Sequence, residues 1–394
     1  MSERTRVVWD PSFTRYDFGR WHPMSPVRLE LTARLCSDLG LFALDDVDVV
    51  SAAPASDDLL RTVHGEEYVA AVKTASADPH RADEQYGLGT DDDPAFRGMH
   101  EAAARIVGGT VDTALAIWRG EARHGVNFCG GMHHAKRDTA AGFCVYNDAA
   151  VAIQALLDQG CERVAYIDLD VHHGDGTEAA FWDDPRVLTL SVHESGRTLF
   201  PGTGYPDELG GPGAEGSAVN LALPAGIGDA GWLRAVAAVA PPLVRAFAPQ
   251  VLITQHGCDT HALDPLGNLT VSVDAQAVAA ALVHDLAHEV SEGRWLALGG
   301  GGYEVVDVVP RTWAQLVAIA VRQPLERGRA VPESWRRHVE ELTGRPAPRT
   351  MSDGVSAGYE PWSGGYDPAD PVDRAVLATR RAAFPLHGLD PEFD

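Results

Sequence analysis

Short apolar runs typical of strands alternate along this chain with longer stretches typical of helices. The runs predict strands at residues 5–9, 46–50, 164–167, 187–192, 219–223, 251–255 and 295–298. The longer stretches predict helices at residues 26–39, 66–74, 96–118, 147–157, 275–290 and 305–321, and a helix over 230–247 that Pro241-Pro242 interrupts. Alternating strands and helices indicate an α/β fold with a mainly parallel central sheet and helices on both faces.

The last part of the chain differs from the rest in amino-acid composition and in its pattern of apolar residues. A polar helix is predicted at residues 335–342, and residues 345–370 are then rich in Pro, Gly and Ser. We expect an ordered but irregular segment that wraps around the molecule, with a final helix near residues 372–382; a disordered tail is the alternative. The expected organisation is a single large domain over residues 1–325 and a C-terminal extension, residues 326–394, packed on it.

Composition narrows the class of partner. The chain has 394 residues, of which 45% are hydrophobic, and its formal net charge is −24. A protein that binds nucleic acid through phosphate contacts would be basic, so that class is disfavoured. An acidic surface instead suits cationic ligands such as amines.

The five cysteines and the N-terminus predict a compartment. The cysteine count is odd and no Cys-x-x-Cys occurs, so neither a disulfide framework nor a thiolate zinc cluster is expected. The first residues lead into a strand rather than into an apolar signal core, and no apolar run approaches the ~20 residues of a membrane span. We therefore expect a soluble, cytoplasmic protein.

The segment Asp168-Leu-Asp-Val-His-His-Gly-Asp-Gly176 concentrates metal-ligand side chains just after a predicted strand. Strand alternation would point Asp168, Asp170 and His172 to one face. Burying two carboxylates there is unfavourable unless a cation neutralises them, which favours a metal bound by Asp170 and His172. Asp259, just past another predicted strand, is the natural third ligand. Turn-forming aspartates with surface histidines are the alternative, which the density of ligands disfavours.

Three protein ligands and an open position are typical of a catalytic metal site. Two oxygens and one nitrogen discriminate weakly between metals, so Fe²⁺, Co²⁺ or Mn²⁺ is an alternative to Zn²⁺.

Further candidate chemistry lies in glycine-containing loops. In Gly130-Gly-Met-His-His-Ala-Lys136, His133 and His134 would manage protons near the metal, if the pair is more than an ordinary loop. The four glycines before Tyr303 allow a close backbone approach, and the tyrosine hydroxyl could donate to a developing oxyanion. Phe143 and Phe200 would wall a narrow apolar channel, with core packing as the alternative.

Together these motifs resemble the zinc-dependent histone deacetylase family of the arginase/deacetylase superfamily, over roughly residues 7–321. The segments that carry the resemblance are His133–Lys136, Ala141–Asp148, Asp168–Gly176, Phe200–Gly204 and Leu298–Tyr303. His193-Glu-Ser-Gly196, Asp264-Pro-Leu266 and the long C-terminal extension are most similar to its bacterial acetoin-utilisation branch. The resemblance implies an arginase-like α/β fold and a catalytic role in amide hydrolysis for the first domain.

The resemblance also implies a role for each matching residue. The implied metal ligands are Asp170, His172 and Asp259, and the implied acid–base pair is His133 and His134, backed by Asp168 and Asp175 respectively. Tyr303 would polarise the acetyl carbonyl. A structural K⁺ would use Asp168, Ser191 and the backbone carbonyls of Asp170 and His172.

Implied substrate contacts complete the site. Phe143, Phe200 and Leu266 would contact the substrate, and the carbonyl of Gly142 would accept from its amide N–H. Asp92 would grip the substrate backbone at the rim, although Asp91 and Asp93 are also candidates. Arg28 would line an acetate-release pocket.

The expected activity is hydrolysis of N-ε-acetyl-lysine on proteins to lysine and acetate. The branch resemblance implies acetylated metabolic enzymes as substrates, acetyl-CoA synthetase first. An acetylpolyamine amidohydrolase is the alternative enzyme, and an arginase-type ureohydrolase would need a second metal and more carboxylates. A non-catalytic acyl-lysine reader conflicts with the intact His133, His134 and Tyr303. The oligomeric state stays open.

Overall fold

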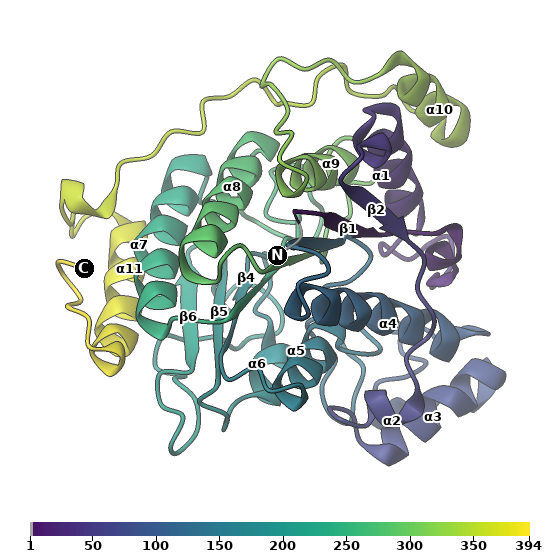
Figure 1. The fold of residues 1–394 in the computed structure, drawn as a ribbon, viewed down its shortest axis with the longest axis horizontal. Coiled ribbons are helices and arrows are strands. Elements are labelled where there is room, and N and C mark those ends of the chain that lie inside the picture. The colour runs from purple at the N-terminus through teal and green to yellow at the C-terminus, as the bar shows by residue number, and fades with distance from the viewer. Residues whose placement is uncertain (1–2) are drawn as a thin grey trace.

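The computed structural model describes residues 3–394, and one sheet runs through the middle of this part of the chain (Figure 1). Its strands are β1 (Thr5–Val8), β2 (Val47–Val50), β3 (His124–Asn127), β4 (Val164–Asp168), β5 (Val187–Glu194), β6 (Ala218–Leu223), β7 (Val251–Gln255) and β8 (Trp295–Leu298). Their order is β2-β1-β3-β8-β7-β4-β5-β6, and every pair is parallel. The predicted α/β fold on a mainly parallel sheet is confirmed.

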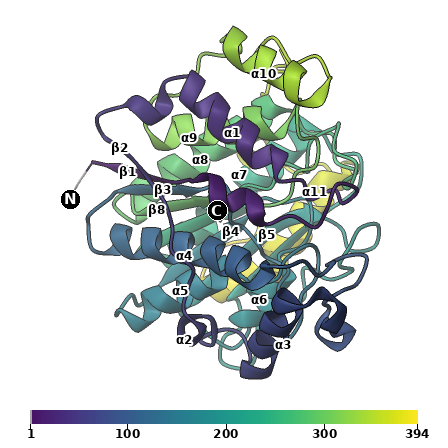
Figure 2. The same ribbon diagram turned by 90° about the vertical axis from the view of Figure 1, so that its right-hand side faces the viewer.

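Helices cover both faces of this sheet, as the sequence predicted. The helices are α1 (Val27–Asp38), α2 (Asp57–Leu60), α3 (Glu66–Ala77), α4 (Met99–Trp118), α5 (Asp148–Asp158), α6 (Asp175–Ala180), α7 (Asp229–Phe247), α8 (Val273–Val290), α9 (Val309–Ala320), α10 (Glu333–Thr343) and α11 (Pro371–Ala383). In Figure 2, α1, α7, α8 and α9 lie on one side of the strands, and α4, α5 and α6 lie on the other. Because both faces are covered, the strands are almost entirely buried.

The prediction that prolines interrupt the helix over 230–247 is wrong, because α7 continues through Pro241 and Pro242. A proline inside a helix removes the N–H that would bind the carbonyl four residues earlier. For Pro242 that carbonyl belongs to Ala238, and Arg380 of α11 donates to it from Nη1 at 2.7 Å. The side chain of Arg380 is fully buried. A residue far along the chain therefore satisfies the carbonyl that Pro242 leaves without a helical partner.

The C-terminal segment follows a defined path over the molecule. α10 packs on α1, where the buried Trp335 donates from Nε1 to the carbonyl of Leu31 at 2.8 Å. The chain then crosses above α8 and α9 with little regular structure and ends in α11 beside α7 and β6 (Figure 1). A buried ion pair fixes this end, since Arg234 of α7 binds Asp373 of α11 at 2.6 Å. The domain boundary at residue 325 stays a prediction.

Two further observations concern the cysteines and the helices. All five cysteines are buried and free. Within residues 3–394, none of the helices combines the length and the hydropathy required to span a bilayer.

Candidate active site

The candidate metal ligands gather beyond the carboxyl ends of neighbouring strands. β4 ends at Asp168, and Asp170 and His172 follow it in the loop that leads to α6. Asp259 lies beyond the end of β7, which is paired with β4. We expected strand alternation to orient Asp170 and His172. This expectation is wrong, because β4 ends at Asp168, before both residues. The loop brings them together instead, at the edge where parallel sheets bind ligands.

Asp170, His172 and Asp259 are buried side chains whose ligand atoms all lie within 4.8 Å of one another. His172 Nδ1 lies 3.0 Å from Oδ1 of Asp170 and 3.2 Å from Oδ2 of Asp259. The other oxygens of the two aspartates accept hydrogen bonds. Asp170 Oδ2 accepts from Gln255 Nε2 at 2.7 Å and from the backbone N–H of Gly301 at 2.8 Å, whereas Asp259 Oδ1 accepts from the N–H of Val171 at 2.9 Å.

The charge balance of this cluster favours a cation. Burial would lower the pKa of His172, but hydrogen bonds to Asp170 and Asp259 outweigh it and raise that pKa to about 10. Burial and the charge of Asp170 raise the pKa of Asp259. Apart from its 3.2 Å ion-pair contact with His172, Oδ2 of Asp259 has no hydrogen-bond partner among the described residues. Two buried carboxylates thus recruit a proton to His172, and a divalent cation fits the same donor set.

His133 and His134 are each oriented by a carboxylate. His133 Nδ1 lies 2.8 Å from Asp168 Oδ2, and His134 Nδ1 lies 2.7 Å from Asp175 Oδ1. The two rings are adjacent, with centroids 4.0 Å apart. A carboxylate at Nδ1 holds the proton on that atom, so Nε2 of each ring is the atom left for chemistry.

The two histidines have opposite pKa shifts. Burial and the charge of His133 lower the pKa of His134 to about 4. Burial also acts to lower the pKa of His133, but the carboxylates of Asp168 and Asp170 outweigh it and raise that pKa to about 9. The carboxylates therefore favour a proton on His133 over one on His134, a difference that acid–base catalysis can use.

Tyr303 ends the glycine run and has Arg28 as a neighbour. Its backbone N–H donates to Asp264 Oδ2 at 2.7 Å, which anchors the residue at the end of the glycine run. The buried Arg28 donates from Nη1 to the carbonyls of Gly300 and Gly302 at 2.9 and 3.0 Å, and its guanidinium lies 6.0 Å from the Tyr303 ring centroid. Burial raises the pKa of Tyr303, so its hydroxyl stays protonated and can donate.

The glycine run before Tyr303 is required by close approach to the cluster. A Cβ atom at Gly301 would lie 1.9 Å from Asp259 Oδ2. Gly300 and Gly302 have φ values of 140° and 143°, a region that side chains disfavour. A side chain at Gly301 would displace the Asp259 carboxylate, and one at Gly300 would displace Gln255, which donates to Asp170.

The predicted substrate residues form a rim around the cluster. Phe143 packs edge-on against Tyr303 with centroids 5.6 Å apart, and Phe200 packs against His134 at 5.0 Å. Phe200 is 48% exposed. Oδ2 of Asp92 accepts from the N–H of Gly142 at 2.8 Å, whereas Asp93 is buried. Of the three adjacent aspartates, Asp92 therefore has both exposure and a contact with the rim.

Two predicted residues lie further from the cluster. Leu266 connects to the site through Asp264, whose Oδ1 accepts from the Leu266 N–H at 3.0 Å. Ser191 is the strand partner of Asp168 in the β4–β5 pairing, and its hydroxyl contacts His193 Nδ1 at 2.8 Å. The K⁺ site expected around Asp168 and Ser191 stays a prediction.

Sequence reasoning missed the residues that support the cluster. Gln255 holds Asp170, Asp264 holds Tyr303, the Tyr166 hydroxyl donates to Asp168 at 2.8 Å, and Lys136 binds Asp175 at 2.8 Å. Gln255 and Tyr166 lie in apolar strands, where a single polar residue is a usable signal. Both ring nitrogens of His173 have partners of their own, the Thr203 hydroxyl and the Glu178 carboxylate.

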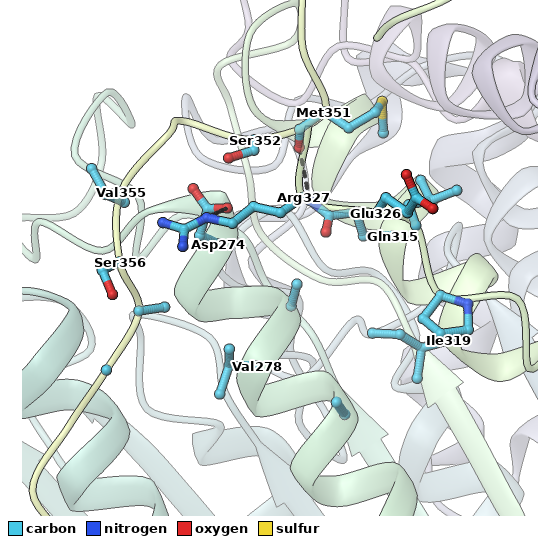
Figure 3. Close-up of a pocket in the computed structure, with 16 residues that line it drawn as sticks. Asp274, Val278, Gln315, Ile319, Glu326, Arg327, Met351, Ser352, Val355 and Ser356 are labelled. Atoms are coloured by element: carbon cyan, nitrogen blue, oxygen red, sulfur yellow. Dashed lines mark hydrogen bonds and ion pairs between the residues drawn. The ribbon is translucent and has the colours of Figure 1, made fainter. Parts of the chain in front are cut away.

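A separate pocket of about 410 Å³ contains none of these residues (Figure 3). Its walls come from α8, α9 and the C-terminal segment, and include Val278, Ile319 and Val355. Gln315 donates across it to the carbonyl of Met351 at 2.9 Å. The pocket is half-lined by the crossing tail and lies apart from the candidate active site.

Comparison with known proteins agrees with the resemblance seen in the motifs. A family model described as "Histone deacetylase domain" matches residues 22–320. The "Acetoin utilization protein AcuC" of Bacillus subtilis (strain 168) is 42% identical over 330 residues, which are 83% of this chain and 84% of that protein. The protein of the same name from Staphylococcus xylosus is 35% identical over 337 residues, 85% of this chain and 87% of its own length.

Proposed function

This chain belongs to the histone deacetylase family, and from that membership we propose that it hydrolyses N-ε-acetyl-lysine on proteins to lysine and acetate. The observation that carries the proposal is the adjacent His133–His134 pair, with each Nδ1 held by a buried carboxylate, beside a three-ligand cation cluster and Tyr303. A site that only bound acetyl-lysine would not need two adjacent histidines that carboxylates orient for proton transfer.

Asp170, His172 and Asp259 would hold the metal, for which we propose Zn²⁺, with Fe²⁺ or Co²⁺ as alternatives. When bound, this ion supplies Lewis-acid polarisation of the amide oxygen and of the attacking water. Gln255 and the N–H of Gly301 donate to one carboxylate oxygen of Asp170, and these hydrogen bonds orient the carboxylate before the ion binds.

His134 is the general base of the proposed reaction. Its Nδ1 is held by Asp175, and its low pKa leaves Nε2 unprotonated at neutral pH, ready to accept the proton of the attacking water. His133 is the proposed general acid, since the Asp168 carboxylate at its Nδ1 favours the protonated ring. It donates that proton to the departing lysine amine.

The Tyr303 hydroxyl donates a hydrogen bond to the oxygen on which negative charge develops. Arg28 supports this position indirectly, because it holds the carbonyls of Gly300 and Gly302 directly before Tyr303. We also propose that Arg28 lines the exit route of the acetate ion, as the family resemblance implies.

The proposed substrate lies against the rim. Phe143 and Phe200 would flank the lysine methylene chain and Leu266 would contact it at the edge, while the Gly142 carbonyl would accept from its amide N–H. Asp92 would bind the substrate backbone with the carboxylate oxygen that Gly142 does not occupy. Acetylated metabolic enzymes are the proposed partners, with acetyl-CoA synthetase first. A K⁺ ion held by Asp168, Ser191 and the carbonyls of Asp170 and His172 would be structural.

An acetylpolyamine amidohydrolase is the second candidate, which the net charge of −24 favours because polyamines are cationic. The test compares acetate release from an acetyl-lysine peptide and from N-acetylputrescine. The proposal expects kcat/KM to be at least tenfold higher for the peptide. A preference for acetylputrescine would replace protein lysine with polyamine as the substrate class.

A further inference from the structure

Three histidines form a second cluster near the amino ends of the strands, at the end of the sheet opposite to the candidate active site. His124 begins β3, and His284 and His288 lie on α8. One ring nitrogen of each lies within 4.8 Å of the others. Ring centroids are 5.0 Å apart for His124 with each α8 histidine and 4.7 Å for the α8 pair. The cluster is at the amino ends of the strands, whereas Asp170 and Asp259 lie beyond the carboxyl ends.

The tautomer of His124 leaves a lone pair aimed into this cluster. Its Nδ1 lies 2.6 Å from the carbonyl oxygen of Ala320, so Nδ1 carries the proton and donates. Nε2 of the neutral ring is then unprotonated, and it lies 3.0 Å from Nε2 of His288. A backbone carbonyl that fixes the far nitrogen of an imidazole is the usual support of a metal-ligating histidine.

His284 and His288 supply the other two nitrogens in the arrangement that a helix provides. Residues four apart lie on the same face of a helix, so both rings turn toward β3. Nε2 of His284 is buried and has no hydrogen-bond partner among the described residues. His288 is exposed, which leaves a path from solvent to the cluster. A buried ring nitrogen without a partner is unfavourable in a purely structural cluster.

We propose that His124, His284 and His288 bind a borderline transition-metal dication such as Zn²⁺, Ni²⁺ or Co²⁺. Three imidazole nitrogens suit these ions, whereas Mg²⁺ and Ca²⁺ prefer oxygen ligands. Tetrahedral coordination at ~2.0–2.1 Å places ligand nitrogens roughly 3.3 Å apart, so the cluster needs only a small closing movement of the side chains. A water molecule would complete the coordination.

The charged side chains around the three histidines are compatible with a bound dication. Arg123 and Arg322 are the nearby cations, but each is paired with a carboxylate, Arg123 with Glu3 at 3.0 Å and Arg322 with Asp46. Asp285 contacts Nδ1 of His284 at 3.1 Å and orients that ring. Burial lowers the pKa of the His124 ring to about 3, so this ring is neutral at pH 7.

The bound ion would tie α8 to the start of β3 and, through Ala320, to the end of α9. Trp295, the first residue of β8, packs edge-on against two of the rings. Its ring centroid lies 5.7 Å from that of His124 and 5.5 Å from that of His284. This position makes the site a structural clamp on the amino edge of the sheet rather than part of the candidate active site.

The test measures bound metal per chain for the full-length protein and for single variants. Each protein is dialysed against micromolar Zn²⁺, and separately Ni²⁺, and analysed by inductively coupled plasma mass spectrometry. We expect His284→Ala and His288→Ala to bind one equivalent less than wild type, and His80→Ala, an exposed histidine elsewhere, to match wild type. Because the readout is the difference between variants, it does not depend on the proposed deacetylase activity.

Thermal unfolding gives a second readout. Zn²⁺ should raise the Tm of wild type by more than that of His288→Ala, and Mg²⁺ should not distinguish the two proteins. The exposed His288 can be replaced without leaving a cavity, so the variant keeps its fold. Equal metal content in wild type and both α8 variants would overturn the proposal. An increase in Tm with Mg²⁺ that the His288→Ala variant loses would also overturn it, because the site would then not be selective for a transition metal.

Discussion

Asp175 accepts from His134 Nδ1 at 2.7 Å on one carboxylate oxygen and binds Lys136 Nζ at 2.8 Å with the other. Burial acts to raise the pKa of Asp175, but its contacts with His134 and Lys136 hold that pKa below its ordinary value. Asp175 therefore stays ionised and keeps the His134 proton on Nδ1. The position of this one carboxylate decides which nitrogen of His134 faces the substrate.

Replacement of Asp175 by Asn should lower kcat on an acetyl-lysine peptide by about 10–100-fold, because the amide no longer fixes the His134 tautomer. The control is Lys136→Met, which removes the other contact of Asp175 and leaves the His134 contact in place. We expect that variant to lose less than about fivefold. Equal losses of kcat in the two variants would show that the Asp175–Lys136 ion pair matters for activity and that the contact of Asp175 with His134 does not.

Asp92→Asn should raise KM for an acetyl-lysine peptide and leave kcat nearly unchanged, with a loss of about tenfold in kcat/KM. The Asn oxygen can still accept from Gly142, so the rim keeps its geometry while the charge for the substrate backbone is lost. The matched control is the neighbouring Asp91→Asn. Steady-state kinetics on both variants separates them, and an unchanged KM in Asp92→Asn would remove Asp92 from the substrate contacts.

Arg234→Met should lower the free energy of unfolding by about 3 kcal/mol, because it leaves the buried Asp373 unpaired. The side chains of Arg234 and Asp373 are 10% and 2% exposed, and Arg234 also donates to three backbone carbonyls of the tail.

The matched control for Arg234 is Arg245→Met on the same helix. Arg245 and its partner Glu289 are each 51% exposed, and breaking that pair should change stability by less than about 1 kcal/mol. Urea unfolding measures both variants, and similar losses would mean that the α7–α11 ion pair does not anchor the tail.

Asp93→Asn should stabilise the protein at pH 8. Burial and the charge of Asp92 raise the pKa of Asp93 from its ordinary 3.8 to about 9. Between these values the native chain keeps a proton that the unfolded chain releases, so wild-type stability falls as pH rises through that window.

Asn cannot ionise, so the Asp93→Asn variant should exceed wild type by more than about 1 kcal/mol at pH 8, and the difference should vanish below pH 4. Urea unfolding across this pH range measures it. A difference independent of pH would mean that Asp93 is ionised in the folded protein.

Strong local patterns made most of the fold predictable. A short apolar run such as residues 251–255 is typical of a central strand that is buried on both of its faces. In the structure this run is β7, which pairs with β4 and β8. β3 was missed because His124-Gly-Val-Asn127 has one strongly apolar residue, and only its place between β1 and β8 makes it a strand. The continuity of α7 was equally hidden, because it depends on Arg380, which is 138 positions from Pro242 along the sequence.

The candidate site was predictable where residue types cluster in sequence. Asp170, His172 and His133 lie in dense motifs, so their convergence could be inferred. Gln255 and Asp264 could not be assigned, since their importance comes from single hydrogen bonds to Asp170 and Tyr303 that only the folded chain makes. The histidine cluster on β3 and α8 was missed for the same reason, because His124 lies 160 residues before His284 along the chain.

The central claim is that this site performs hydrolysis, and the most direct test is acetate release from an acetyl-lysine peptide by wild type and Tyr303→Phe with equal bound metal. Phe keeps the ring that packs on Phe143 and removes only the hydroxyl that donates to the developing oxyanion. We predict that kcat falls by about 10²–10³-fold while the metal content and the Tm stay the same. A folded, metal-loaded Tyr303→Phe protein with wild-type kcat would contradict the account.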